Sequence, residues 1–274
     1  MTAIAVLQMT AGIDPAANAA TLEQAIARAA AGGAAMLFTP EMSGLIDRDR
    51  ARAAPHLVAE DDDPVLARVR AAAAEHRLWV HLGSLAVREG DGRLANRGYV
   101  IDDTGAIRAR YDKMHLFDVD LPSGESWRES ASYARGERAV VVDTPVGRLG
   151  LAICYDLRFP ALFAALTEAG ATILSVPAAF TRPTGAAHWH ILLRARAIEA
   201  GVHLVAAAQT GEHQDGRATY GHSLVVGPWG EVLLDMEEPA GLGFATIDAG
   251  QVDAVRERLP AIRHRRAIAP VERA

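Results

Sequence analysis

The chain has 274 residues, of which 50% are hydrophobic and 23% charged, so it can bury a substantial core. Its net charge of −6 is mild, and its basic residues are scattered apart from a short cluster at 263–266, which argues against nucleic acid as a partner. It lacks a secretory signal and the roughly 18 apolar residues of a membrane span, and its lone cysteine cannot form an internal disulfide. We therefore expect a cytoplasmic protein, not associated with membranes, that forms a single domain over residues 1–274.

Short apolar runs of β type alternate with alanine-rich helical patterns in the first half of the chain. The runs predict strands at residues 4–8, 35–38 and 78–82, and the helical patterns predict helices at 22–30 and 64–76. We expect Gly83 to end the third strand. Turn residues predict two β-hairpins, in which 99–102 pairs with 106–111 and 140–142 pairs with 149–153.

The same alternation continues after Cys154. Strands are predicted at 171–176, 202–208, 223–226, 231–234 and 244–247, and helices at 160–168, 189–199 and 251–257. The hairpins require that parts of the sheets are antiparallel, and the alternation places helices on the outer faces. The pattern therefore predicts an α/β protein with mixed sheets covered by helices.

The single cysteine lies at a position suited to reactivity. Cys154 ends an apolar strand and precedes a polar turn, and a helix is predicted to begin at Pro160. Side chains at the carboxyl end of a strand face the edge where α/β proteins form their sites, and a helix N-terminus favours a thiolate. The alternative is an inert cysteine in the core, which composition alone favours.

Two charged residues occur in apolar surroundings. Glu41 follows the predicted strand at 35–38, and Lys113 lies within the largely apolar stretch 111–117. Most glutamates and lysines are solvated at the surface. A charge among buried neighbours must be paired or functional, so these residues are candidate partners for the thiol.

The segments around these three residues resemble the signatures of the nitrilase superfamily of carbon-nitrogen hydrolases. Glu41 lies in Thr-Pro-Glu-Met-Ser, Lys113 in Tyr-Asp-Lys-Met-His-Leu-Phe and Cys154 in Ile-Cys-Tyr-Asp-Leu-Arg-Phe-Pro, in that family's order. Further similarity occurs at 177–180, 188–189, 193–199, 220–223 and 228–230. The resemblance implies an αββα sandwich of two mixed β-sheets flanked by helices, assembled as a homodimer or a higher homo-oligomer.

The resemblance also implies a Glu-Lys-Cys amide hydrolase that needs neither a metal nor an organic cofactor. Glu41 would be the general base and Cys154 the nucleophile, while Lys113 and the backbone N–H of Tyr155 would stabilise the oxyanion. Glu129 matches a second glutamate of the family that positions the lysine and the substrate. Solvation at the surface is the alternative for this residue.

Segments 205–213, 219–223 and 259–266 are most similar to the deaminated-glutathione amidase branch. The substrate would then be a small amide of a 2-oxo acid, with a peptide amine or ammonia as the leaving group. Activity as an ω-amidase or as an N-carbamoyl amino acid amidohydrolase remains an alternative. Three positions depart from residues common in related sequences and can alter the substrate preference: Ala161, His190 and Gly227.

Four residues are expected to bind the substrate: Tyr155, Ala179, Phe180 and Arg182. Arg182 would supply the cation for an anionic substrate, because its loop follows a strand that should end beside the cysteine. A surface arginine is the equal alternative. Truncation of this side chain should then raise KM for dicarboxylic amides.

Other chemistries remain open. A Cys-His hydrolase could use His115 or His222, because imidazole is the commonest partner of a catalytic thiolate. Metal binding by His188 and His190 is disfavoured, because residues two apart on a helix point about 200° apart. The fold could also serve a catalytically silent binding or regulatory protein, or an acyltransferase that passes the thioester to an amine.

Overall fold

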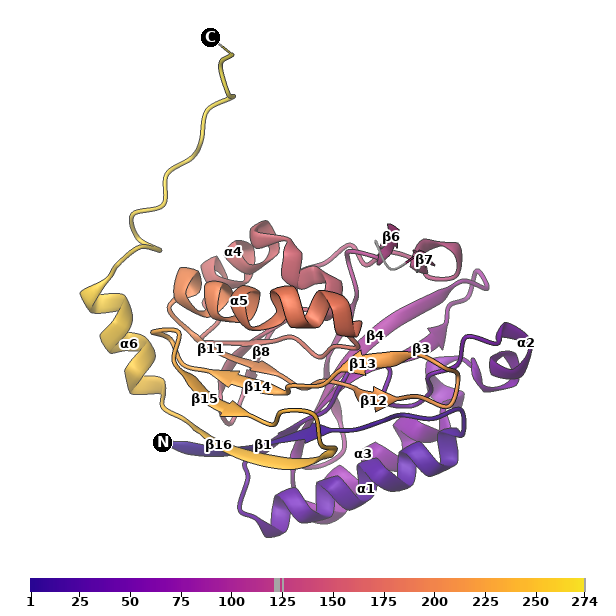
Figure 1. Ribbon diagram of the computed structural model, residues 1–274. Helices are drawn as coiled ribbons and strands as arrows, with labels where there is room; N and C mark the ends of the chain where they lie inside the picture. Colours follow the sequence, from indigo (N-terminus) through magenta and orange to yellow (C-terminus); the bar gives the residue numbers. More distant parts are fainter. Residues whose placement is uncertain (121–123, 125, 274) are drawn as a thin grey trace.

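The computed structural model describes residues 1–120, 124 and 126–273. Two six-stranded sheets pack against each other, and helices cover their outer faces (Figure 1). Helices α1 (Pro15–Ala31) and α3 (Pro64–His76) cover the first sheet, while α4 (Pro160–Glu168) and α5 (Arg182–Ala200) cover the second. The αββα sandwich implied by the resemblance is confirmed.

The first sheet has the strand order β16-β1-β2-β3-β4-β5. Its strands in chain order are β1 (Thr2–Gln8), β2 (Met36–Phe38), β3 (Trp79–Arg88), β4 (Leu94–Ile101), β5 (Ile107–Asp112) and β16 (Gly241–Ile247). Strands β1, β2 and β3 are parallel, and the other pairings are antiparallel. The carboxyl ends of the parallel strands therefore lie at one edge, and Glu41 follows β2 at this edge.

The second sheet has the strand order β15-β14-β11-β10-β9-β8. Its strands in chain order are β8 (Val141–Thr144), β9 (Gly147–Leu151), β10 (Ile173–Ser175), β11 (His203–Ala206), β14 (Leu224–Val226) and β15 (Val232–Asp235). Strands β9, β10 and β11 are parallel. Cys154 follows β9, so both sheets contribute strand ends to one site.

Several short elements were not expected from the sequence. Two antiparallel pairs lie at the end of the sandwich opposite α6 (Figure 1): β6 (Asp118–Asp120) with β7 (Ser126–Arg128), and β12 (Thr210–Glu212) with β13 (Ala218–Tyr220). Also unexpected are the short helix α2 (Arg50–Ala53) and the 3₁₀ turns η1 (Ala54–His56), η2 (Glu60–Asp62), η3 (Glu129–Ala131) and η4 (Cys154–Arg158). Helix α6 (Ala249–Arg258), by contrast, confirms the helix predicted at 251–257. No helix among the described residues combines the length and apolarity needed to cross a membrane.

Helix α1 begins at Pro15 and α5 at Arg182, earlier than the hydrophobic periodicity predicted. Asp14 caps α1 by accepting a hydrogen bond from the N–H of Ala16 at 2.9 Å, and proline at the first helical position needs no N–H partner. Helix α5 likewise has Pro183 in its first turn. In both helices the local signals at the N-terminus, rather than the apolar face, determine the start.

Strand β3 continues through Gly83, contrary to the prediction that it ends there. A Cβ atom at this position would overlap the carbonyl groups of Thr39 and Pro40. The Thr39 hydroxyl accepts a hydrogen bond from the Gly83 N–H at 3.0 Å. Glycine is therefore required because two backbones approach closely, and this contact fixes the segment that leads to Glu41.

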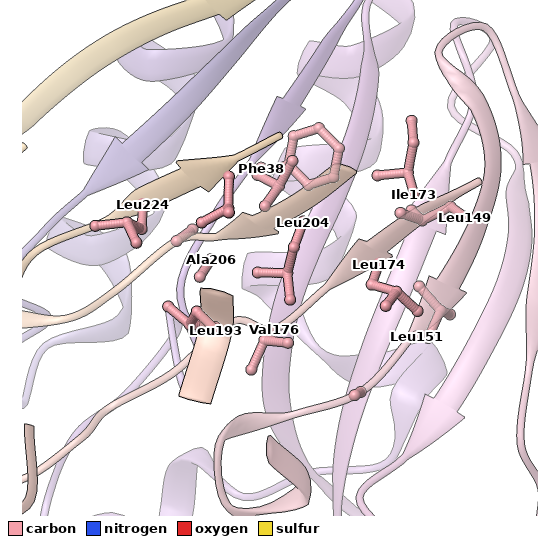
Figure 2. Close-up of a cluster of buried hydrophobic side chains, with 14 of the residues drawn as sticks. Phe38, Leu149, Leu151, Ile173, Leu174, Val176, Leu193, Leu204, Ala206 and Leu224 are labelled. Atoms are coloured by element: carbon pink, nitrogen blue, oxygen red, sulfur yellow. The ribbon is translucent and has the colours of Figure 1, made fainter. Parts of the chain in front are cut away.

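The core consists of two buried clusters. One lies between the sheets and extends beneath α4 and α5, and the other lies between the first sheet and helices α1 and α3. Figure 2 shows part of the first cluster, in which Phe38 of the first sheet lies among side chains of the second, including Ile173 and Leu204. Burial of each such side chain contributes roughly 1.5–3 kcal/mol. This packing holds the strand ends of both sheets in fixed positions.

Candidate active site

Glu41, Lys113 and Cys154 meet at a cavity of about 720 Å³. Glu41 follows β2, Lys113 follows β5, and Cys154 begins the 3₁₀ turn η4 after β9. The Lys113 Nζ atom lies 2.9 Å from Glu41 Oε1. The three residues are only 4%, 2% and 8% exposed, respectively, so they form a buried floor to the cavity.

Glu129 completes this floor, which we define as Glu41, Lys113, Glu129 and Cys154. The Lys113 Nζ atom is 2.9 Å from Glu129 Oε2. Asn96 donates from Nδ2 to Glu41 Oε1 at 2.9 Å and to Glu129 Oε1 at 3.1 Å. The sequence reasoning missed Asn96, whose only signal is a polar residue in an otherwise largely apolar strand. The network compensates the desolvation of the buried charges.

The second oxygen of Glu41 is also fixed. The Ala179 N–H donates to Glu41 Oε2 at 2.9 Å, and the carboxylate interacts with the Cys154 thiol. Gln209 donates from its side chain to the Glu41 carbonyl at 3.0 Å, which holds the backbone of this residue. The carboxylate is therefore oriented towards the thiol before any ligand binds.

The electrostatics of the floor favour a neutral thiol beside an ionised carboxylate. Burial opposes ionisation of Glu41, but the Lys113 ammonium and several hydrogen bonds outweigh it, so the pKa of Glu41 is lowered. Burial, followed by the nearby Glu41 charge, raises the pKa of Cys154 well above its ordinary value. Burial opposes protonation of Lys113, but Glu129 and Glu41 raise its pKa.

This charge state corrects the expectation that a helix N-terminus stabilises a Cys154 thiolate. The cysteine is followed by a 3₁₀ turn of five residues rather than by an α-helix, and the Glu41 carboxylate lies beside it. A negative neighbour disfavours a second negative charge. The surroundings of Cys154 therefore favour the thiol over the thiolate.

The backbone of Cys154 is strained. Its φ of 49° lies in the left-handed region, which residues with a side chain rarely adopt. Its N–H donates to the Pro177 carbonyl at 2.9 Å, which holds the turn in place. Such strain costs on the order of 1–3 kcal/mol and is common at active sites.

Asp156 connects the cysteine turn to the segment that carries the lysine. One oxygen of its fully buried carboxylate accepts from the Ile153 N–H at 2.9 Å and from the Tyr111 hydroxyl at 2.7 Å. The other oxygen accepts from the His115 backbone N–H at 3.0 Å and lies 2.7 Å from Nδ1 of the same residue. The sequence reasoning did not single out Asp156, although it lies two residues after the cysteine.

Three of the four expected substrate-binding residues line the cavity, namely Tyr155, Ala179 and Phe180. Arg182 is absent from the described lining residues. Its side chain is 48% exposed and lies 4.0 Å from Glu212. We expected a loop at this position. Helix α5 already begins at Arg182, and the side chain of this residue lies near Glu212 instead of among the residues that line the cavity.

No histidine is among the described residues that line the cavity. The His115 ring contacts Asp156 and stacks on Phe159 with ring centroids 3.6 Å apart, while His222 Nδ1 lies 2.9 Å from Asp235. Neither imidazole is therefore placed to accept the thiol proton.

Elsewhere among the described residues, the side chains of His190, His222 and Asp235 bring donor atoms within 4.8 Å of one another, a spacing that a metal ion could use. Both imidazoles are already hydrogen-bonded to the Asp235 carboxylate, which explains the cluster without an ion. The neighbouring His188 faces Arg158 instead, so His188 and His190 do not share a face.

The fold and the floor define a cysteine hydrolase of the αββα type, and known proteins agree. A family model described as carbon-nitrogen hydrolase matches residues 3–257. The chain is 40% identical over 268 residues to a deaminated glutathione amidase of Yersinia enterocolitica, covering 97% of this chain and 93% of that protein. The chain belongs to the carbon-nitrogen hydrolase family and is an amide-hydrolysing enzyme.

Two solved structures extend the comparison. The NitFhit protein of C. elegans superposes with a TM-score of 0.89 at 41% identity over 97% of this chain, which spans 65% of that fusion protein. An amidase from Nesterenkonia sp. AN1, in which acrylamide had added to the active-site cysteine, superposes with a TM-score of 0.79 at 30% identity, covering 95% of this chain and 98% of that one.

Proposed function

We propose that this enzyme hydrolyses deaminated glutathione or a closely related amide of a 2-oxo acid, with Cys154 as the nucleophile. The observation that carries the proposal is the buried floor, where the Cys154 thiol lies beside the Glu41 carboxylate and Lys113 Nζ lies 2.9 Å from the same carboxylate. The similarity to deaminated glutathione amidases over nearly the whole chain supports the substrate class.

In the first half-reaction, Glu41 accepts the thiol proton while the Cys154 sulfur attacks the amide carbon. Lys113 and the backbone N–H of Tyr155 stabilise the negative oxygen of the tetrahedral intermediate. The carbon–nitrogen bond then breaks, and Glu41 returns the proton to the departing amine. A thioester remains on the enzyme, and deaminated glutathione would release cysteinylglycine.

In the second half-reaction, Glu41 removes a proton from water, which attacks the thioester carbon. The tetrahedral intermediate collapses to the 2-oxo acid, and the thiolate recovers the proton from Glu41. Glu129 and Asn96 hold the lysine and the carboxylate in position throughout, as their hydrogen bonds indicate. The absence of histidine from the described cavity lining favours this scheme over a Cys-His pair.

Mass spectrometry tests the nucleophile directly, because the chain has one cysteine. With slow amide substrates, an acyl adduct is expected on the peptide that contains Cys154, and Cys154→Ala should form none. Values of kcat/KM should be highest for deaminated glutathione among that compound, 2-oxoglutaramate and N-carbamoyl amino acids. If a broad amide panel gave neither product nor adduct, the chain would be a binding protein instead.

We also infer that the chain forms a homodimer and acts in the cytoplasm. The outer surface around α5 exposes Ile191 (70%), Ile198 (46%) and Trp229 (63%), side chains that a monomer rarely leaves in water together. A lone thiol is suited to a reducing compartment. Sedimentation at micromolar concentration should give the mass of two chains, and a monomer mass would contradict the inference.

A further inference from the structure

The upper wall of the active-site cavity is rich in cations. Beyond the floor, its charged lining residues are one aspartate and five arginines: Asp47, Arg48, Arg50, Arg88, Arg128 and Arg217. The aspartate is already paired with Arg52, at 2.6 Å. The floor, by contrast, combines two carboxyl groups with one ammonium group. Arg128 is paired with Asp120 at 2.8 Å, so cations of the lining that could meet an anionic ligand must be sought among the others.

Two of these arginines flank one aromatic ring. The guanidinium carbon of Arg217 lies 5.3 Å from the Trp127 ring centroid, and that of Arg48 lies 6.0 Å from it. Both cations also approach Asp215, whose side chain is fully buried: the Nε atoms are 2.8 Å and 3.9 Å from Oδ2 for Arg217 and Arg48, respectively. We call Arg48, Trp127 and Arg217 the rim.

These contacts use only part of each guanidinium. Within the described part of the chain, Arg217 makes its side-chain hydrogen bond through Nε, and no hydrogen bond engages the Nη groups of either arginine. The ring and Asp215 fix the orientation of the cations, while the planar Nη donors stay available. Such donors match a carboxylate, which has two coplanar acceptor oxygens.

An aromatic wall connects the rim to the nucleophile. Tyr155, next to the cysteine in the chain, packs on Phe117 with ring centroids 5.1 Å apart, and Phe117 lies 6.2 Å from Trp127. All three rings line the cavity. The carboxylate of a short 2-oxo dicarboxylic monoamide lies on the acyl side of the scissile bond. A leaving group of two residues adds roughly 7 Å of extended chain on the other side of that bond, so its terminal carboxylate can lie along this aromatic wall.

We propose that Arg48 and Arg217 form an anion subsite that binds the terminal carboxylate of the leaving group. The preferred substrates are then amides of a 2-oxo acid with a short peptide-like amine that ends in a carboxylate. This inference rests on the proposed function and specifies its substrate class. The role differs from the one expected of Arg182, which was to bind the carboxylate of a dicarboxylic amide.

Three substrates test the subsite. They are a 2-oxo acid amide of a dipeptide with a free carboxylate, the same compound with a terminal carboxamide, and 2-oxoglutaramate. The wild-type enzyme should prefer the carboxylate over the carboxamide by at least about tenfold in kcat/KM, as expected for a charge-assisted hydrogen bond. Arg217→Gln and Arg48→Gln should each remove most of this preference by raising KM for the substrate with the free carboxylate. The values of kcat/KM for the other two substrates should change less than about twofold.

Two further variants sharpen the result. Trp127→Leu should weaken the preference by only about two- to fivefold, because it removes a stacking contact and leaves the charges. Arg148→Gln is the control matched to Arg48: its side chain is 45% exposed, close to the 54% of Arg48, and is paired with Asp143, but it lies on β9 and is absent from the described lining of the cavity. All three substrates should be unaffected by it.

The outcomes separate the two proposals. Equal losses on all three substrates in the rim variants, or a wild-type enzyme indifferent to the terminal charge, would overturn the subsite and leave the amidase intact. A wild-type enzyme that hydrolyses none of the three and forms no adduct on Cys154 would overturn the proposed function itself.

Discussion

The charged groups on the floor of the cavity are buried and held by several partners each, whereas the rim arginines are partly exposed and held along one edge. Lys113 contacts two carboxylates and is 2% exposed, while the side chain of Arg48 is 54% exposed. Floor residues follow strands of the two sheets, or are hydrogen-bonded to residues that do. Rim residues come from connecting segments and from the short strand β7. On the roles proposed for these residues, the rigid sandwich supports the chemistry and the connections determine which amide is bound.

Among the changes that test the contrast between the floor and the rim, Glu41→Gln is expected to have the largest effect on activity. The replacement keeps the shape but removes the proton acceptor, so kcat/KM should fall by about 10³-fold, within the range for loss of a general base. Steady-state hydrolysis of deaminated glutathione measures the effect, and a thermal melt confirms folding. A loss below about tenfold, similar to that of a rim variant, would place the proton acceptor elsewhere.

Asp156→Asn should have an intermediate effect. One oxygen of Asp156 accepts a hydrogen bond from the backbone N–H of Ile153, and the other accepts one from the backbone N–H of His115. In either orientation of an asparagine side chain, its NH₂ group would face one of these N–H donors and the hydrogen bond would be lost. Displacement of the turn should lower kcat by about 10- to 100-fold with KM nearly unchanged. A lower melting temperature with normal kcat would instead show that Asp156 serves stability alone.

The smallest effect is expected from pH. Because the pKa of Glu41 is lowered while those of Cys154 and Lys113 are raised, kcat/KM should vary less than about twofold between about pH 6 and 9. Activity should fall only below the ordinary glutamate value of 4.5. The free energy of unfolding depends on pH in the same direction. The stabilisation that Glu41 contributes is present above pH 4.5, the ordinary pKa of a glutamate, and is lost as the pH falls through its lowered pKa in the folded protein.

A pH–rate profile at constant ionic strength measures this behaviour. An inflection between about pH 6 and 8 would indicate an imidazole in the mechanism, since free histidine titrates near about 6.5.

Much of the floor could be predicted from the sequence. Glu41 and Cys154 each follow an apolar run, Lys113 lies within a largely apolar stretch, and strand ends at one edge of a sandwich lie close together. The family resemblance indicated that these three residues act together in one site, which their spacing in the sequence could not show. Asn96 and Asp156 escaped attention because their importance arises from hydrogen bonds across long sequence separations.

The rim could not be predicted for a different physical reason. Arg217 is positioned by Asp215 and stacks on Trp127, which belongs to a separate short strand pair without an apolar alternation. Periodicity carries no signal for such pairs, nor for the first turns of α5 that displaced Arg182. The fold class followed from the apolar pattern, but contacts between connections depend on the finished sandwich.

The left-handed backbone of Cys154 has an evolutionary consequence. Glycine adopts this conformation freely, so at position 154 the residue that suits the backbone is not the residue that performs the chemistry. Selection for stability and selection for turnover therefore oppose each other there. In a lineage that no longer needs the reaction, the nucleophile would be among the first residues lost, so retention of cysteine in this conformation is a signature of continuing use.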